Sequence, residues 1–485
     1  MKVSQVREAL RKIITGEVLW EKEILNYYSV DASSYQIIPK VIVIPKNETD
    51  VINLVKFAKK IKMPVTVRGA GTGLVGSALN DGIIVDLKYL SSIKIEKNFV
   101  TIGGGVLKGM LDKKLKEKSK FFPPNPSVGA FCGLGGMLGN NSSGSRSLKY
   151  GSVIDNVKEI TFVTGKGEKI TLPNNKKIGK KILELSKEIS IENYPTSSKN
   201  SSGYRLDAIK TIDDTQKIVI GSEGTLGIIL SAKLKIKNIP KKRILCIVEY
   251  KSIRKAAKEC NEILKTNPSA IEFVDKITLK QIPQKFNQKN QCLFFVEYDS
   301  DTALKIKELQ KIVTGKISKK ITKETEIQKW WRYRDSSLYY SLKSIRMKNR
   351  IPHIIEDAAV PIDKFEMLFS IINKLNQKFG TRAIMYGHAG NANIHVRLIA
   401  DRSKTTRIKE IAKYYFTNIV KMKGTISAEH GDGLARSEYV KFQYGQQNYD
   451  VFSRVKKVFD PQGILNPGKI ISTKSTIANN FEKID

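Results

Sequence analysis

One glycine-rich segment, RGAGTGLVGSALNDG (Arg68 to Gly82), limits the folds that this chain can adopt. A strand-like run precedes it, and its glycines allow sharp turns and positive φ angles. Such a loop can direct several backbone N–H groups at an anion such as a pyrophosphate. The run Gly71 to Gly76 also fits G-x-G-x-x-G, but the dinucleotide-binding form of that fingerprint requires a helix directly after it.

The residues after the last of these glycines leave no room for that helix. Only Ser77 to Gly82 precede the next strand-like run, Ile83 to Leu87, whereas a parallel crossover through a helix takes about a dozen residues or more. We therefore expect a strand-loop-strand rather than a βαβ unit. A purely structural turn is the alternative for a single loop of this kind, so the other loops decide between the two.

Two further loops are rich in small residues. Phe121 to Gly151 mixes glycine, serine and asparagine with prolines, and this composition predicts a loop that wraps a ligand. Gly221 to Ile229 carries glycines at three-residue spacing and follows KNSSGYRLD (Lys199 to Asp207). Because three such loops fall in one part of the chain, we expect them to converge on one ligand.

The chain has 485 residues, which is too many for one hydrophobic core, so we expect two or more domains. Because 41% of the residues are hydrophobic, the chain can build such cores and is expected to be globular. No apolar run approaches the roughly 20 residues of a membrane span, and the N-terminal segment lacks the apolar stretch of a signal peptide. We therefore expect a cytoplasmic protein. The cysteines, at positions 132, 246, 260 and 292, form no C-x-x-C motif and are expected to be buried thiols.

The net charge of +37 raises nucleic acid or an anionic membrane surface as partners. The lysines are, however, spread over the whole chain, and no basic cluster carries interleaved stacking aromatics. A general lysine bias is the simpler interpretation, and a nucleic-acid binder is disfavoured. The positive field would still attract an anionic cofactor or substrate.

The hydrophobic pattern predicts alternating strands and helices. Ile37 to Asn47 is expected to contain a strand, and Thr49 to cap the amphipathic helix that follows. A helix is expected over Leu107 to Lys118 and a strand pair within 157–172. After Ile239 the pattern becomes a mixture of strands and lysine-rich helices, so we place a domain boundary there.

All four histidines lie beyond residue 350. In YGHAGNANIHVRL a turn that contains His388 leads into a strand. In that strand Asn393, His395 and Arg397 share one face, and apolar residues occupy the other. The polar face is therefore expected either to be exposed or to line a site.

A second segment, TISAEHGDG, ends a strand with adjacent Glu429 and His430. Two imidazoles and a carboxylate on strand ends predict a divalent-metal site with open positions, suited to Zn or Mn. His353 has no neighbouring glycines, acidic residues or further histidines of this kind in the sequence, and we expect a structural role for it.

The segment KWWRYRD offers Trp330, Trp331, Arg332 and Arg334. A surface helix capped by aromatic side chains is one interpretation. The other is that a guanidinium here binds a carboxylate through two hydrogen bonds.

These motifs, together with a closing DPQGILNPGKI (Asp460 to Ile470), occur in the order of a known family over about residues 30 to 472. The chain resembles the FAD-linked D-2-hydroxyacid dehydrogenases of the vanillyl-alcohol oxidase superfamily. The resemblance implies an α+β fold, in which a PCMH-type FAD-binding domain of two α+β subdomains precedes an α+β FAD-linked oxidase C-terminal domain with an antiparallel sheet. We expect a helical lead-in over residues 1–36, these two domains over 37–238 and 239–472, and a tail over 473–485.

The resemblance also assigns the cofactor site. Members that tether the flavin covalently use a histidine in the first glycine loop, where this chain has none, so FAD is expected to be noncovalent. The implied FAD-binding residues are Arg68, Gly69, Ala70, Gly71, Thr72, Gly73, Gly76, Ser77, Pro124, Asn125, Ser127, Gly136, Gly139, Asn140, Ser143, Tyr150, Gly151, Gly221, Glu223, Gly224 and Thr225.

The implied metal ligands are His388, His395 and Glu429, and the implied catalytic base is His430. Arg334 matches the arginine that holds the substrate carboxylate, and Asn393 is the second implied substrate residue. One departure stands out: the family usually has Asp and Gly where this chain has Asn391 and Ala392.

The implied activity is oxidation of a D-2-hydroxy acid, such as D-lactate, glycolate or D-2-hydroxyglutarate, to the 2-oxo acid. Electrons would then pass to a quinone, a cytochrome, an electron-transferring flavoprotein or an iron–sulfur subunit. A flavin-bearing subunit that is inactive alone is one alternative. A non-redox enzyme like the alkylglycerone-phosphate synthases is another, although that branch has consecutive histidines near the position of Glu429 and His430. We further expect a homodimer, with peripheral contact at the inner face of the membrane left open.

Overall fold

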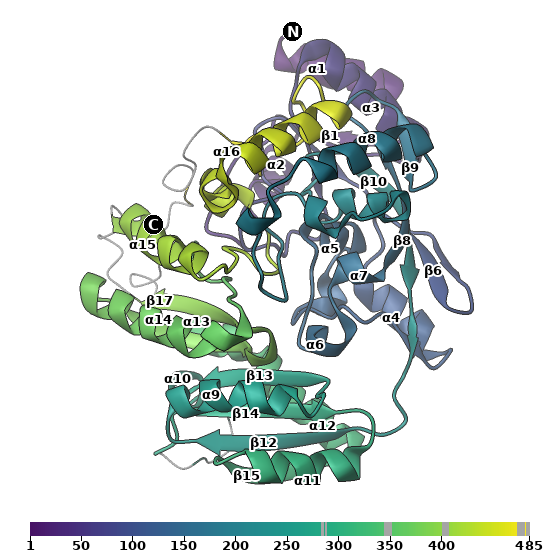
Figure 1. Cartoon of the computed structure of the whole chain (residues 1–485). Helices are drawn as coiled ribbons and strands as arrows, with labels where there is room; N and C mark the ends of the chain where they lie inside the picture. Colours follow the sequence, from purple (N-terminus) through teal and green to yellow (C-terminus); the bar gives the residue numbers. More distant parts are fainter. Residues whose placement is uncertain (283–285, 287–288, 344–351, 400–406, 473–480, 482–485) are drawn as a thin grey trace.

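The computed structural model describes residues 1–282, 286, 289–343, 352–399, 407–472 and 481 of the chain, so most of the predicted tail lies outside the described residues. For description we divide the described residues at the predicted domain boundary into an N-terminal part (residues 1–238) and a C-terminal part (239–472). The N-terminal part contains a four-stranded and a five-stranded sheet, and the C-terminal part contains a six-stranded sheet (Figure 1). The predicted α+β class is confirmed.

The first sheet has the strand order β1-β2-β4-β3. Its elements are α1 (Val3–Ile13), β1 (Glu17–Leu19), α2 (Lys22–Tyr28), β2 (Val41–Ile44), α3 (Glu48–Ile61), β3 (Val65–Arg68) and β4 (Ile83–Asp86). Thr49 was the wrong cap for α3. Asn47 caps it instead, because the Asn47 side chain accepts a hydrogen bond from the backbone N–H of Asp50.

The glycine loop joins β3 to β4 without a helix, as predicted. The two strands nevertheless pair in parallel, with Val65 opposite Ile83 and Arg68 opposite Asp86. The loop is therefore the crossover connection. It carries the chain from the end of β3 back to the edge of the sheet at which β3 begins.

The second sheet has the order β5-β6-β10-β8-β9, with every neighbouring pair antiparallel. Its strands are β5 (Ile93–Ile95), β6 (Phe99–Gly103), β8 (Val157–Val163), β9 (Lys169–Leu172) and β10 (Ile228–Lys235), and β7 (Lys120–Phe121) pairs separately with β11 (Lys237–Asn238). The associated helices are α4 (Lys108–Lys116), α5 (Leu134–Asn140), α6 (Ser147–Tyr150), α7 (Val153–Asn156) and α8 (Lys176–Lys187). The prediction of one irregular loop over Phe121 to Gly151 is therefore wrong in part, because Leu134, Met137 and Leu138 bury one side of α5 in the core.

The third sheet has the order β15-β12-β14-β13-β16-β17 and is antiparallel throughout, as predicted. Its strands are β12 (Ile244–Tyr250), β13 (Ala270–Asp275), β14 (Cys292–Tyr298), β15 (Lys316–Ile321), β16 (Arg382–His388) and β17 (Asn393–Ile399). Its helices are α9 (Ile253–Leu264), α10 (Lys276–Leu279), α11 (Thr302–Ile312), α12 (Glu324–Asp335), α13 (Ser337–Lys343), α14 (Phe365–Phe379) and α15 (Ile408–Lys421).

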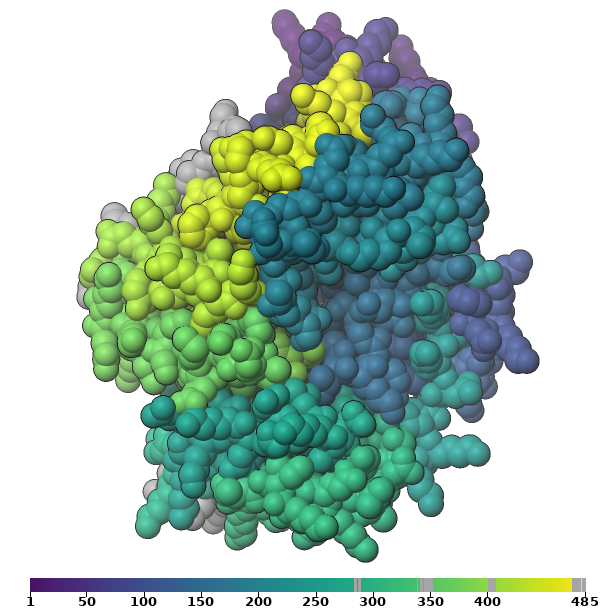
Figure 2. All heavy atoms as spheres, viewed as in Figure 1, coloured from purple at the N-terminus to yellow at the C-terminus, as the bar shows by residue number. Residues whose placement is uncertain are grey.

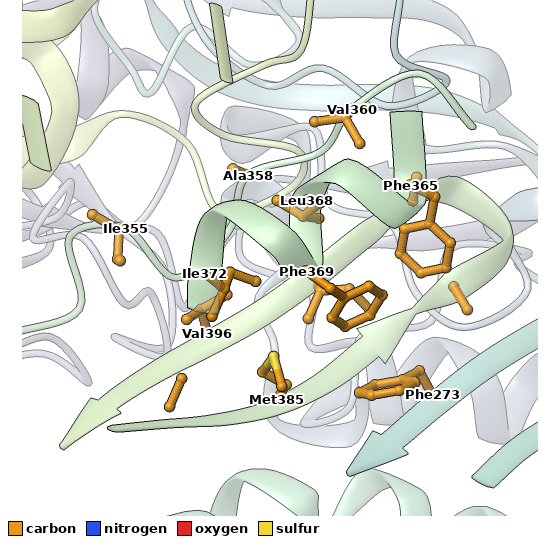
Figure 3. Close-up of a cluster of buried hydrophobic side chains, with 14 of the residues drawn as sticks. Phe273, Ile355, Ala358, Val360, Phe365, Leu368, Phe369, Ile372, Met385 and Val396 are labelled. Atoms are coloured by element: carbon orange, nitrogen blue, oxygen red, sulfur yellow. The ribbon is translucent and has the colours of Figure 1, made fainter. Parts of the chain in front are cut away.

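Alternation along β16 and β17 gives this sheet an apolar face and a polar face. Met385 and Val396 pack with Phe369 and Ile372 of α14 (Figure 3). Tyr386 and its partner across the ladder, His395, point the other way. The core under α14 therefore fixes which side chains face the opposite side of the sheet.

Helix α12 covers part of that opposite side. Trp330 and Trp331 are 1% and 7% exposed and pack with Leu293 and Phe295 of β14. The interpretation of KWWRYRD as a surface helix is therefore wrong for the two tryptophans. The predicted burial of the four cysteines is confirmed.

The last helix, α16 (Gly433–Phe459), returns from the C-terminal part to the N-terminal part. It bends at Gly445, where φ is 75°. Beyond the bend, Phe452, Val455 and Phe459 join the core beneath the second sheet. Figure 2 shows this helix, in yellow, lying against the blue surface of the N-terminal part. Among the described helices, none combines the length and apolarity that a membrane crossing requires.

The closing segment after α16 fastens the glycine loop. Asn466 donates to the backbone carbonyls of Ser77 (2.9 Å) and Glu223 (2.6 Å), and its Oδ1 accepts from Thr66 Oγ1 (2.9 Å). Lys469 Nζ donates to the carbonyl of Leu79 at 2.6 Å. The segment after α16 is therefore bonded directly to the glycine loop that the sequence singled out.

Replacement of Asn466 tests this connection. Asn466 has φ 39°, so Asn466→Gly removes the side chain without adding left-handed backbone strain. We expect the free energy of unfolding in urea to fall by about 2–4 kcal/mol, because buried carbonyls lose their donors. The matched control, Asn238→Ala, removes one exposed hydrogen bond to Lys120 and should change stability by about 0.5 kcal/mol or less. Equal effects of the two variants would contradict the assigned role.

Candidate functional site

A cavity of about 620 Å³ lies between the glycine loop and the polar face of the third sheet. The predicted cofactor residues that line it are Arg68, Gly69, Ala70, Gly71, Thr72, Gly73, Ser77, Ser127, Gly136, Gly139, Asn140, Ser143, Glu223 and Gly224. Its far end is lined by Asp335, Tyr386, His395, Arg397, Glu429 and His430. The cavity therefore connects the predicted phosphate cradle with the histidine motifs.

The glycines of the cradle are required by its geometry. Gly71 has φ +69°, and a Cβ there would lie 2.3 Å from Arg68 Nη2. Arg68 is itself held, because its Nη1 donates to the carbonyl of Val30 at 2.6 Å. At Gly136, no described atom lies within 4 Å of the Cβ position. A backbone that is fixed on one side and open to the cavity on the other fits a bound dinucleotide.

Other predicted cofactor residues lie outside the lining of this cavity: Gly76, Pro124, Asn125, Tyr150, Gly151, Gly221 and Thr225. Several of them support it. A Cβ on Gly76 would lie 2.9 Å from Leu434 at the start of α16, and Thr225 Oγ1 bonds to Tyr204 and to the carbonyl of Ser222. Tyr150 bonds through its hydroxyl to Asp299 of the C-terminal part.

Three imidazoles converge on one carboxylate oxygen. The Nε2 atoms of His388, His395 and His430 lie 3.0, 3.3 and 3.6 Å from Oε1 of Glu429. The rings of His395 and His430 are stacked, with centroids 5.0 Å apart. The structure thus brings together the three predicted metal ligands and the predicted base.

Carboxylates on the far side of the His388 and His430 rings fix the orientation of those two rings. His388 Nδ1 lies 2.8 Å from Glu272 Oε1, and His430 Nδ1 lies 2.7 Å from Glu356 Oε1. His395 Nδ1 lies 3.5 Å from Glu356 Oε2. Because an ionised carboxylate can only accept, the two hydrogen bonds of His388 and His430 favour a proton on Nδ1 and leave Nε2 to bind a ligand.

Asp357 holds the backbone that carries Glu429 and His430. Its Oδ2 accepts from the N–H groups of Ala428, Glu429 and His430 at 3.0, 3.0 and 2.8 Å. It also accepts from the hydroxyl of Ser427 at 2.9 Å. The sequence did not identify Glu356 or Asp357 as site residues. Two adjacent acidic residues are unusual in a lysine-rich chain, and this pair was the feature that could have indicated them.

The second oxygen of Glu429 is bound by the N-terminal part. Lys199 Nζ lies 3.0 Å from Oε2, and the hydroxyl of Ser143 donates to the same atom. Lys199 belongs to the KNSSGYRLD loop, but the sequence did not identify its amine as a site group. Both parts of the chain are therefore needed to neutralise this carboxylate.

The electrostatics of the cluster follow from these contacts. Burial alone would raise the pKa of Glu429, but Lys199 and His388 hold it well below its usual range. Burial opposes protonation of His430, yet Asp357 and Glu356 outweigh it and raise the pKa of His430 to about 9. A cation placed beside this imidazole would act in the opposite direction, because like charges disfavour the protonated ring.

The donor set fits a divalent cation. One ligand atom from each of Asp357, His395, Glu429 and His430 can lie within 4.8 Å of the others, and His388 adds a further imidazole to the same point. Imidazole nitrogens with carboxylate oxygens suit Zn or Mn. The ligand set His388, His395 and Glu429 stays a prediction.

Arg334 and Asn393, the predicted substrate residues, have partners within the protein. Arg334 pairs with Glu272, with Nε 2.5 Å from Oε2, while its Nη1 reaches the Ser127 hydroxyl at 3.2 Å. Asn393 donates to Asp357 Oδ1 at 3.3 Å and to the carbonyl of Ala358 at 3.2 Å. Neither lines the cavity, so their substrate roles stay predictions.

The two unusual residues of the histidine loop have defined roles in the fold. Asn391 accepts from the hydroxyl of Ser147 and donates to that of Ser198, both at 2.9 Å. Ala392 has φ 47°, in the left-handed region that favours glycine. The loop therefore keeps the backbone turn without the glycine and connects to the N-terminal part through Asn391.

The structure adds side chains to which the sequence assigned no individual role in the site. Tyr386 and Arg397 line the cavity beside His395. His353, for which we expected a structural role, is buried close enough to Arg397 for that charge to lower its pKa further than burial alone does. Alternation of β17 was the signal for Arg397.

Two family descriptions match the chain. Residues 39–173 match a family described as FAD binding domain, and residues 239–470 match one described as FAD linked oxidases, C-terminal domain. These ranges contain the glycine loop and the histidine cluster.

Among curated proteins, the glycolate oxidase subunit GlcD of Bacillus subtilis is 26% identical over 463 residues, which are 92% of each chain. The D-2-hydroxyglutarate dehydrogenase of Escherichia coli is 28% identical over 91% of this chain and 49% of its own length; the chain thus spans about half of that relative. A solved alkyldihydroxyacetonephosphate synthase matches with a TM-score of 0.68, 19% identity and coverage of 97% of this chain and 85% of its own. This last likeness concerns the fold.

Crowding of the cradle should expel the cofactor. Gly71→Ala places a methyl group against the fixed guanidinium of Arg68, and we expect the bound flavin per chain, measured by absorbance, to fall at least about tenfold, which corresponds to about 1.4 kcal/mol. The matched control is Gly463→Ala, because Gly463 has φ +67° with no described atom within 4 Å of its Cβ position. The control carries the same backbone strain and should retain flavin. Full flavin content in both variants would contradict the assignment of the cradle.

Proposed function

Because the chain belongs to the FAD-linked D-2-hydroxyacid dehydrogenase family, we propose that it oxidises a small D-2-hydroxy acid to the 2-oxo acid. One observation carries this proposal: one cavity is lined both by the glycine cradle and by His395, Glu429 and His430. The two named relatives, a glycolate oxidase subunit and a D-2-hydroxyglutarate dehydrogenase, support the class of substrate.

The cradle residues Arg68 to Gly73, with Ser77 and Gly136, would hold FAD noncovalently along the cavity. When bound, FAD would accept the hydride from the α-carbon of the acid. The protein's part is to hold the acid at the far end of the cavity, to exclude water and to take the hydroxyl proton.

His388, His395 and Glu429 would hold the metal, which would lower the pKa of the substrate hydroxyl as it does for bound water. We assign removal of the hydroxyl proton to Nε2 of His430. Its side chain is 22% exposed towards the cavity, against 3% for His388 and 6% for His395. Glu356 holds its Nδ1 and stabilises the ring once it is protonated.

The electrons must then leave the chain. The four cysteines are all buried and unpaired by disulfides and form no cluster motif, so a quinone, a cytochrome, an electron-transferring flavoprotein or an iron–sulfur subunit would accept them. An inactive flavin subunit and a non-redox enzyme remain the alternatives. The homodimer and the cytoplasmic location stay predictions.

Anaerobic titration with D- and L-2-hydroxy acids tests the reaction. We expect one D-acid among lactate, glycolate and 2-hydroxyglutarate to bleach the flavin absorbance, because hydride transfer reduces the ring. A chelator should abolish the bleaching while FAD stays bound, and Zn or Mn should restore it. A yellow protein that none of these acids bleaches would contradict a dehydrogenase that acts alone.

Substitution of the proposed base separates proton removal from binding. His430→Gln should slow flavin reduction by about 10²–10⁴-fold, the usual contribution of a positioned acid or base, with FAD and metal contents unchanged. Arg382→Gln is the control, because this exposed side chain of β16 does not line the cavity, and the variant should reduce flavin at nearly the wild-type rate. Reduction of His430→Gln at the wild-type rate would remove the role.

A further inference from the structure

Arg397 of β17 lines the cavity, and its Nη1 has no hydrogen-bond partner among the described residues. It lies two residues after His395 on the same face of the strand, is 3% exposed and lines the cavity. Burial of a guanidinium is costly unless its donors are bound. A buried arginine that faces a cavity therefore indicates what the cavity is built to hold.

The contacts of Arg397 within the protein are few and long. Its Nε lies 3.4 Å from the hydroxyl of Tyr386, and its Nη2 lies 4.0 Å from Glu356 Oε2. Among the described residues, Nη1 has no hydrogen-bond partner. Glu356 is also shared, because its Oε1 binds Arg436 at 2.9 Å and His430 at 2.7 Å. The charge of Arg397 is therefore only partly compensated.

Two other buried arginines near the cluster differ in this respect. Arg334 is paired with Glu272 and bonded to Ser127. Arg436 donates through Nε to the carbonyl of Ile354 and through Nη1 to that of Gly431, both at 2.8 Å, and through Nη2 to Glu356. Of these three, only Arg397 presents an unbound nitrogen and also lines the cavity.

We propose that Arg397 binds a carboxylate of the substrate and is the residue that selects acids at this site. The assignment rests on the proposed function. Residues two apart on a strand are separated by about 7 Å, so a carboxylate on Arg397 lies within the length of a small organic acid from His395 and His430. A planar guanidinium suits a carboxylate, and Nη1 of Arg397 is a buried donor without a partner among the described residues.

The first test measures binding without turnover. Propionate carries a carboxylate but no hydroxyl, and its binding to the FAD-loaded protein is followed by the change in flavin absorbance. Arg397→Gln should raise the dissociation constant by about 10- to 100-fold, the size of a lost charge-assisted hydrogen bond. The matched control, Arg382→Gln, removes an exposed arginine from the neighbouring strand β16 and should leave binding unchanged.

A second variant keeps the test valid if Arg397→Gln loses its flavin. Arg397→Lys retains the charge but lacks the planar fork, so we expect propionate binding to weaken by a few-fold with FAD content unchanged. Unaltered propionate binding in flavin-loaded Arg397→Gln, or in Arg397→Lys if only that variant retains flavin, would overturn the proposal.

Turnover identifies which carboxylate Arg397 binds. A rise in KM for both D-lactate and D-2-hydroxyglutarate, with kcat changed less, assigns Arg397 to the carboxylate next to the hydroxyl. A rise for D-2-hydroxyglutarate alone assigns it to the distal carboxylate. If no 2-hydroxy acid reduces the wild-type flavin while propionate binding still depends on Arg397, the proposed reaction fails and the anion site stands.

Discussion

Neutralisation of the buried Glu429 carboxylate is the constraint on which the site depends. A carboxylate removed from water is costly unless cations or donors surround it. Its Oε2 is bound by Lys199 and Ser143 of the N-terminal part, and its Oε1 is faced by imidazoles of the C-terminal part. Neither part alone supplies the partners of both carboxylate oxygens, so the site is complete only when the two parts are in contact.

The register of the β16–β17 hairpin transmits the packing of the core to the site. Met385 and Val396 fit beneath α14, and this contact turns Tyr386, His395 and Arg397 towards the cavity. A slip of one residue would bury the imidazole under the helix and expose the apolar side chains. Packing of the apolar face thus determines where the polar side chains lie, although Met385 and Val396 themselves do not line the cavity.

The sequence was sufficient for features that depend on local pattern. The glycine loop and the histidine motifs were predicted because spacing and periodicity express them, whereas the antiparallel C-terminal sheet was predicted from the family resemblance. Long-range pairing was not predictable in this way: Glu272 lies 62 residues before its partner Arg334, and Lys199 is one of 84 basic residues. Burial of Trp330 and the parallel pairing of β3 with β4 likewise depend on contacts with distant parts of the chain, which a local sequence pattern does not indicate.

The return of α16 to the N-terminal part has a consequence for synthesis on the ribosome. The N-terminal part emerges first, but Phe452, Val455 and Phe459 complete its core only after the whole six-stranded sheet has been translated. Until then, the apolar surface beneath the second sheet lacks its cover. The core of the N-terminal part is therefore completed only after the six-stranded sheet has been made, and the cavity that adjoins both parts forms after that.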